Sequence, residues 1–222
     1  MQFFITTTTS PMVDWGDGTI EPIAIGNVTP FTTINATPSH TYRSSGDYTI
    51  KISGISAFSN YSKKDLYHGK LLSVTDWGGI EWTNMQIMFK YANHLNLFPA
   101  TGPNMEKVGD MNQMFFGATT FNQSLANFNT ENVRDMSEMF YEASAFNQSL
   151  ASFNTVKVTN MHRMFKGAFA FNQSLANFNT ENVRDMSEMF NGAHTFNQPL
   201  TSFNTAKVTK MTAMFVEATA FN

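Results

Sequence analysis

Residues 121–145 read FNQSLANFNTENVRDMSEMFYEASA, and this stretch decides the fold because it recurs along the chain. Its first residue, Phe121, returns every 25 residues, at Phe146, Phe171, Phe196 and Phe221. The methionines behind it keep the same period, as at Met136, Met161, Met186 and Met211. A unit this short cannot bury its own apolar side chains, whereas stacked units bury them against one another. The sequence therefore predicts a solenoid of stacked coils.

The repeat continues upstream in a weaker form, which sets the number of coils. Val108, Met111 and Phe115 precede their counterparts by 25 residues, and an earlier coil carries Trp77 and Phe89 at matching internal spacing. The join between these two coils needs one extra residue. Residues 121–140 and 171–190 are identical, which indicates duplication of a two-coil unit of 50 residues. We therefore expect about six 25-residue coils over residues 70–222.

Spacing within one coil predicts its local structure. Met136, Met139, Phe140 and Ala143 have helical spacing and predict a short helix or 3₁₀ turn. The phrase at 122–128 predicts a short strand that stacks in parallel from coil to coil. Methionine fills irregular gaps in cores, so the methionine stripe indicates core. Two ladders are expected between coils. The first joins stacked asparagines such as Asn122 and Asn147, and the second runs Glu138–Arg163–Glu188 on the surface.

The first part of the chain lacks the repeat. Residues 48–52 alternate and predict a half-buried strand, and Thr- and Ile-rich segments between turns suggest a small all-β sandwich over 1–54. Residues 55–69 are expected to be a linker that helps cap the first coil. Asp14 and Asp17 in VDWGDGT are weak candidates for a calcium site. The spacing does not match an EF-hand, so carboxylates that cap backbone N–H groups of a turn are favoured.

Composition excludes several function classes. The chain has 222 residues, no Cys, a net charge of −3 and only 14% charged residues, with 22 Phe and 15 Met. It therefore has no disulfide scaffold and no cysteine chemistry, and a nucleic-acid partner is not expected. No apolar run reaches the ~20 residues of a membrane-spanning helix, so no membrane insertion is expected in this segment. The start of the chain does not resemble an intact signal peptide.

Motifs of catalysis are missing as well. The five histidines form no metal-binding pattern, and the sequence has no GxSxG, P-loop or GxGxxG. We therefore expect no enzyme, no cofactor and no metal.

The two parts of the chain together resemble a known pairing. MFxxAxxFNQxLxxFNTxxVxxM over residues 70–222 resembles the BspA-like surface proteins, whose repeat is also called the mycoplasma-type lipoprotein repeat. WGDGT followed by HTYxxxGDYTIxISG is similar to the PKD-like β-sandwich that often precedes such repeats. The resemblance implies a leucine-rich-repeat-like solenoid on exported bacterial proteins that adhere to host or environmental macromolecules, and no catalytic residues. The family commonly has Trp-Asp where this chain has Phe-Asn, as at Phe128-Asn129.

Candidate binding residues are those that vary between coils at positions expected to face outward. Tyr141, Lys166 and Asn191 share one such position, and Phe169 and His194 share another. Phe169 is the aromatic member of a set that is otherwise small or polar. His162 and Arg163 complete the candidates.

Three functions stay open from sequence alone. The first is a cell-surface adhesion or recognition module that binds an extracellular protein or glycan. The second is a structural stalk or self-assembling surface protein that associates through its uncapped C-terminal coil. The stop at Phe221 and Asn222 indicates either such a pairing surface or truncation of a longer array. The third is a flat-array binder of ice or polysaccharide, suggested by the row Thr130, Thr155, Thr180 and Thr205.

Overall fold

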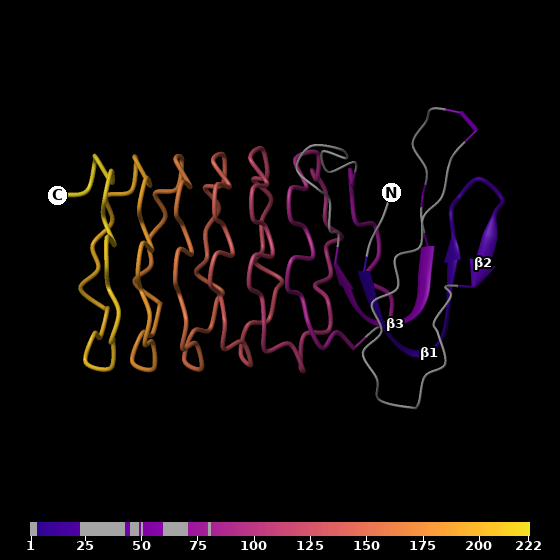
Figure 1. Cartoon of the computed structure of the whole chain (residues 1–222), viewed down its shortest axis with the longest axis horizontal. Helices are drawn as coiled ribbons and strands as arrows, with labels where there is room; N and C mark the ends of the chain where they lie inside the picture. The colour runs from indigo at the N-terminus through magenta and orange to yellow at the C-terminus, as the bar shows by residue number, and fades with distance from the viewer. Residues whose placement is uncertain (1–3, 23–42, 45–48, 50, 60–70, 80) are drawn as a thin grey trace.

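The computed structural model describes residues 4–22, 43–44, 49, 51–59, 71–79 and 81–222. Residues 71–79 and 81–222 form a row of similar coils stacked side by side, with the C-terminus at one end of the row (Figure 1). A small β-sheet lies at the other end. No helix in the described residues is long and apolar enough to cross a membrane.

The sheet has three antiparallel strands in the order β2-β1-β3. Its strands are β1 (Phe4–Asp14), β2 (Ile20–Pro22) and β3 (Lys51–Ser59). The Thr-rich stretch in β1 favours strand because β-branched side chains suit the pleated surface. Asp14 pairs with Ile20 on one side and with Lys51 on the other, so β1 is the central strand.

This sheet differs from the expectation in one boundary. Strand β3 runs to Ser59, five residues beyond the expected domain end at 54 and into the expected linker at 55–69. Residues 60–69 of that linker lie outside the described residues, as do residues 23–42 and 45–48 of the expected sandwich.

Backbone hydrogen bonds join each coil to the next. Four amides of one coil donate to carbonyls of the following coil: Met136 to Asn160, Glu138 to His162, Phe140 to Met164 and Glu142 to Lys166, at 2.7–3.1 Å. The same set recurs from 111 to 117 and from 161 to 167. Within residues 136–142 and their equivalents, every N–H that bonds to another coil points toward the C-terminal neighbour. Every carbonyl that does so points toward the N-terminal neighbour. Parallel bridges link Asp110, Asp135, Asn160, Asp185 and Lys210 beside it.

The predicted helix is replaced by consecutive turns in the described coils. Glu138 and Glu142 have positive φ angles of 55° and 54°, and the equivalent residues of the other coils do too. A left-handed residue ends any helix, since it turns the next peptide out of line. The predicted strand at 122–128 is likewise irregular, and the parallel pairing occurs as single bridges at Asp135 and its equivalents. Inter-coil hydrogen bonds compensate for the left-handed backbone.

Two columns of phenylalanine fill the core. Phe115, Phe140, Phe165, Phe190 and Phe215 stack at 5.6–5.7 Å between ring centroids, nearly parallel. The second column is Phe121, Phe146, Phe171, Phe196 and Phe221, at 5.8–6.0 Å. Rings of the two columns stack within each coil, as Phe140 does on Phe146 at 4.0 Å. Met136, Met139 and their equivalents up to Met189 are fully buried, which confirms the methionine stripe as core.

The asparagine ladder forms as predicted. The side-chain oxygen of Asn122 accepts the backbone N–H of Asn147 at 2.9 Å, and Asn147 accepts that of Asn172 at 3.0 Å. The ladder continues through Asn197 to Asn222. Each amide therefore satisfies a turn N–H in the next coil that lacks a partner in its own.

Candidate functional site

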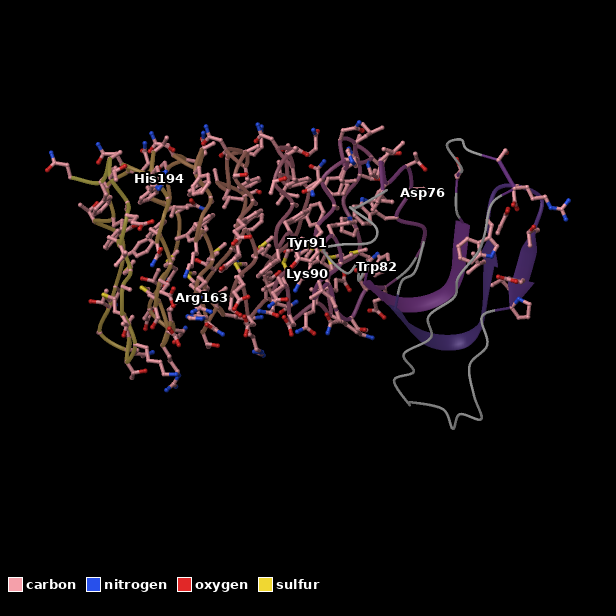
Figure 2. All side chains as sticks on the ribbon, turned by 45° about the horizontal axis from the view of Figure 1, so that its top comes forward. Asp76, Trp82, Lys90, Tyr91, Arg163 and His194 are labelled. Carbon is pink, nitrogen blue, oxygen red and sulfur yellow. The ribbon has the colours of Figure 1, made fainter. Side chains whose placement is uncertain are left out.

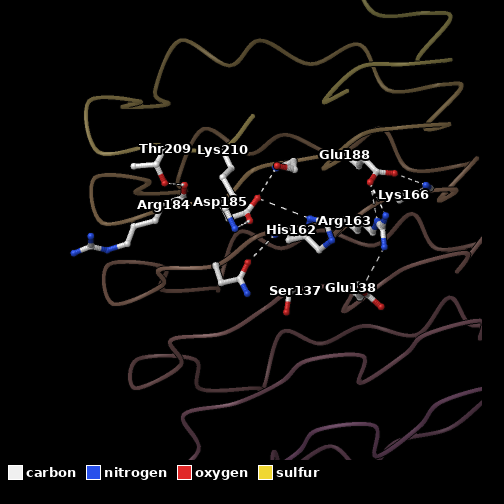
Figure 3. Close-up of polar contacts among 12 residues, drawn as sticks. Ser137, Glu138, His162, Arg163, Lys166, Arg184, Asp185, Glu188, Thr209 and Lys210 are labelled. Carbon is white, nitrogen blue, oxygen red and sulfur yellow. Dashed lines mark hydrogen bonds and ion pairs between the residues drawn. The ribbon is translucent and has the colours of Figure 1, made fainter. Parts of the chain in front are cut away.

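The charged ladder on the surface has the predicted register. Nε and Nη2 of Arg163 donate to Oε1 of Glu188 at 3.0 and 2.6 Å, and Nη1 lies 4.0 Å from Oε1 of Glu138 (Figure 3). Lys166 donates to Oε2 of Glu188. Glu188 thus has one cation on each carboxylate oxygen, and the ladder crosses three coils.

These two cations change the acidity of Glu188. Hydrogen bonds from Arg163 and then from Lys166 lower the pKa of the Glu188 carboxyl to about 2, against the opposing effect of burial. The carboxylate is therefore ionised over the whole physiological range. Its two partners hold it in place, so Arg163 and Lys166 are engaged within the molecule.

His162 belongs to a second charged group, one position away from the ladder. Its Nδ1 lies 3.8 Å from Oδ1 of Asp185, and Nζ of Lys210 lies 3.6 Å from Oδ2 of the same carboxylate (Figure 3). Burial raises the pKa of Asp185, but hydrogen bonds from Ser187 and the charges of His162 and Lys210 outweigh it, so the net shift is downward. His162 thus faces Asp185 in the next coil.

Tyr141 lies in a column of alternating cations and rings. It stacks on Phe116 at 4.4 Å with parallel planes. Nζ of Lys90 lies 4.2 Å above the other face of Phe116, and Nζ of Lys166 lies 5.8 Å from the Tyr141 centroid. Lys90 also donates to Oε1 of Gln113 at 2.7 Å. Burial lowers the pKa of Lys90, partly offset by the charge of Glu138.

This column is closed at both ends. An ammonium group lies near the ring at each end, attracted by the negative ring face, and Tyr91 also meets Phe116 edge-on at 5.6 Å. Lys90 was missed in the sequence analysis, although it follows Phe89 and so occupies the same repeat position as Phe116, Tyr141 and Lys166 once the extra residue in the first join is counted.

Phe169 and His194 form a second aromatic pair on the surface. Their rings stack at 4.8 Å with 10° between planes, and Phe169 is 47% exposed. Figure 2 shows His194 well separated from Arg163 across the width of the stack. The candidates therefore divide. Tyr141, Arg163 and Lys166 are engaged in one group, whereas Phe169 and His194 form another; Asn191, which is half-buried, occupies the repeat position of Tyr141 and Lys166.

Glu142 is a surface residue that the sequence analysis missed. Its Cγ lies 3.3 Å from the place that a Cβ on Gly167 would take, so its side chain covers that glycine. It is exposed, and its carboxylate has no hydrogen-bond or ion-pair partner among the described residues. The signal was present, because the same repeat position reads Gly117, Glu142, Gly167, Gly192 and Glu217.

Asp14 and Asp17 each accept a backbone N–H two residues ahead. Oδ1 of Asp14 accepts from Gly16 at 2.9 Å and Oδ1 of Asp17 from Thr19 at 3.0 Å. This is the geometry of carboxylates that cap turns. The residues that the structure describes contain no group of three or more potential metal ligands.

The threonine row lies inside the coils as far as Thr180, and its last member, Thr205, is exposed. Thr130, Thr155 and Thr180 are each 1% exposed. The hydroxyl of Thr130 donates to the carbonyl of Asn154 at 3.0 Å and accepts its N–H at 2.8 Å. These hydroxyls join consecutive coils and cannot present a flat array to ice or polysaccharide, so the row gives no support to that alternative.

Comparison with known proteins identifies a family but no function. Residues 83–187 and 146–222 match the family described as "Mycoplasma protein of unknown function, DUF285". The two matches together span more than half of the chain, so the protein belongs to this family. No curated protein and no solved structure matches the sequence.

Proposed function

We propose that this DUF285-family chain is a non-enzymatic recognition module, in which a leucine-rich-repeat-like solenoid presents varied side chains to an extracellular protein or glycan. The fold assignment is supported by the hydrogen-bonded stacking of coils at 25-residue offsets. The BspA-like resemblance supports a place at a bacterial cell surface and a PKD-like character for the N-terminal sheet.

One observation carries the proposal. Core positions repeat from coil to coil, but several exposed positions vary, and the exposed pair Phe169–His194 breaks the pattern with two stacked rings. An apolar ring that is 47% exposed adds nothing to the core, whereas exposed aromatic side chains are frequent in binding surfaces. Asn191, three residues before His194 in the same coil, occupies the other varied position.

An array of glycans and extracellular-matrix proteins tests the proposal with the full chain. The matched variant carries Asn191→Val and His194→Thr, the residues that the next coil has in Val216 and Thr219. We expect saturable capture of at least one ligand and at least a fivefold weaker signal for the variant. A chain that captures no ligand, or a variant that binds as well as the parent, would contradict the proposal.

A further inference from the structure

The two surface columns of rings differ at their ends. In the first, Lys90 lies over Phe116, which Tyr91 also meets edge-on, and Lys166 lies over Tyr141. In the second, Phe169 stacks on His194 toward the C-terminal neighbour, so its other face points toward the preceding coil. The equivalent residue there is Ser144, which is small. No ring or cation covers that face of Phe169 among the described residues.

A carboxylate borders the same place. Glu142 covers Gly167, and Cε1 of Phe169 lies 3.9 Å from the place that a Cβ on Gly192 would take. That Cβ would lie 3.6 Å from Cα of Gly167, so the two glycines are neighbours. Glu142 and Phe169 therefore border one pair of glycines, which carry no side chain between them.

At two other places in the protein, a lysine ammonium group lies over an aromatic ring and also donates to a side-chain oxygen. Lys90 lies over a ring and donates to the Gln113 side chain, and Lys166 lies near a ring and donates to Glu188. In both, an ammonium group meets a ring and an acceptor oxygen. Phe169 and Glu142 supply a ring and an acceptor without the ammonium.

We propose that Phe169 and Glu142 form a docking site for a lysine side chain in a basic segment of a partner protein. This rests on the proposed function and names the partner's chemistry. The ring face attracts the cation and the unpaired carboxylate neutralises it. The net charge of −3 favours a basic partner over an acidic one. Ser144, the residue at the equivalent position of the preceding coil, has a small side chain.

The chemistry favours an ammonium group over a sugar. A sugar ring needs several directed hydrogen-bond partners as well as an apolar face. Ser144 Oγ donates its proton to the carbonyl of Thr119 at 3.2 Å, so it has no free donor for a sugar hydroxyl, and Glu142 supplies the charged acceptor. One acceptor beside one ring face satisfies a single cationic group, which is the pattern at Lys90 and Lys166.

The test measures binding of a fluorescent Lys-Ser repeat peptide to the full chain by fluorescence anisotropy at low salt. A Glu-Ser repeat peptide and a neutral maltooligosaccharide are the comparison probes. The variants are Phe169→Ser, which copies Ser144, and Glu142→Gln, with Glu217→Gln as the control. Glu217 occupies the same repeat position as Glu142 in another coil. Circular dichroism and thermal unfolding establish that each variant is folded.

We expect the Lys-Ser peptide alone to bind, with about two- to fivefold weaker binding for each of F169S and E142Q and no change for E217Q. Equal losses for all three variants would mean general attraction to an acidic surface and would overturn the site. Loss of maltooligosaccharide binding in F169S, with peptide binding intact, would make it a sugar site. No binding of the Lys-Ser peptide would also overturn the proposal. A ligand captured on the array without dependence on Phe169 would leave the recognition function standing and remove only this site.

Discussion

At the scale of single residues, the most distinctive group is Glu188 between Arg163 and Lys166. Its carboxylate accepts from a guanidinium at 2.6 Å and from an ammonium group, and its side chain is 18% exposed. Bidentate contacts to two cations are the exception among surface ion pairs, most of which contribute little. Protonation of Glu188 at low pH would therefore remove both ion pairs and weaken the contact between coils.

We predict that Glu188→Gln lowers the free energy of unfolding at pH 7, because it removes the ion pairs with Arg163 and Lys166. The loss should be only on the order of 1 kcal/mol, because solvent screens these pairs. The folded pKa of Glu188 is about 2, below the ~4.3 of an unfolded glutamate, so its contribution is present above about pH 4.5. It is lost as the pH falls toward 2. Urea unfolding at pH 7, 4 and 2.5 should show the difference between parent and variant shrinking.

The control for this measurement is Glu181→Gln. Glu181 lies 3.8 Å from Lys207, and both side chains are at least half exposed. Its substitution should change stability by a few tenths of a kcal/mol at most. A difference between E188Q and the parent that stays constant from pH 7 to pH 2.5 would refute the role assigned to Glu188.

At the scale of the element, sequence reasoning succeeded with periodicity and failed with backbone conformation. The spacing of Met136, Met139, Phe140 and Ala143 identified the buried face, and all four are fully buried. The same spacing also suits a run of turns, so it could not reveal the left-handed φ at Glu138. Glutamate rarely adopts that conformation, and only hydrogen bonds to the neighbouring coil explain it. Such long-range compensation leaves no local signal in sequence.

The candidate site was predictable to a similar extent. Variation between coils placed Phe169 and His194 at one outward-facing position, and the structure adds that their rings stack on each other. It also selected Arg163 and Lys166, whose charges the structure engages with Glu188. Residue type and repeat position predict that a side chain lies on the surface. They do not show whether the side chain is long enough to form an ion pair with a residue of the neighbouring coil.

We predict that Gly167→Ala and Gly192→Ala each destabilise the stack by roughly 1–2 kcal/mol, because both glycines have left-handed φ angles of 69° and 72°. Gly167→Ala should cost more, since its Cβ would meet Glu142 at 3.3 Å while that of Gly192 meets ordinary contacts. Chemical denaturation measures both. Gly79 has open space around it, so Gly79→Ala is the control that should be nearly neutral. Equal stability of the parent and both variants would show that the left-handed conformation costs nothing here.

At the scale of the whole molecule, each coil contacts its neighbours and little else. Hydrogen bonds, phenylalanine columns and charged ladders all connect one coil with the next. Stability is then close to a sum of coil and interface terms, and a coil can be removed without destroying the rest. The cores of adjacent coils are interchangeable because Phe140, Phe165 and Phe190 stack alike. The exposed ladders are not interchangeable, since their charges alternate.

Two deletions of equal length separate the contribution of core packing to stability from that of the charged ladders. Removing residues 146–170 would bring Glu138 next to Glu188 and Asp135 next to Asp185, like charges in both ladders. Removing residues 171–195 would keep Arg163 beside Glu138 and bring Asn160 next to Lys210. We predict that both chains fold, because the 25-residue register is preserved. The first should unfold at lower urea at pH 7, by about 1 kcal/mol in low salt.

The difference between the two deletions should disappear when the charges are removed. Protonation of the carboxylates near pH 3, or screening by about 1 M salt, where the Debye length falls to ~3 Å, should bring the two unfolding curves together. A gap that persists under both conditions would mean that core packing, not ladder charge, distinguishes the coils. Convergence would show that coil order in this stack is set by the alternation of Glu138, Arg163 and Glu188, while the buried phenylalanine columns accept any order.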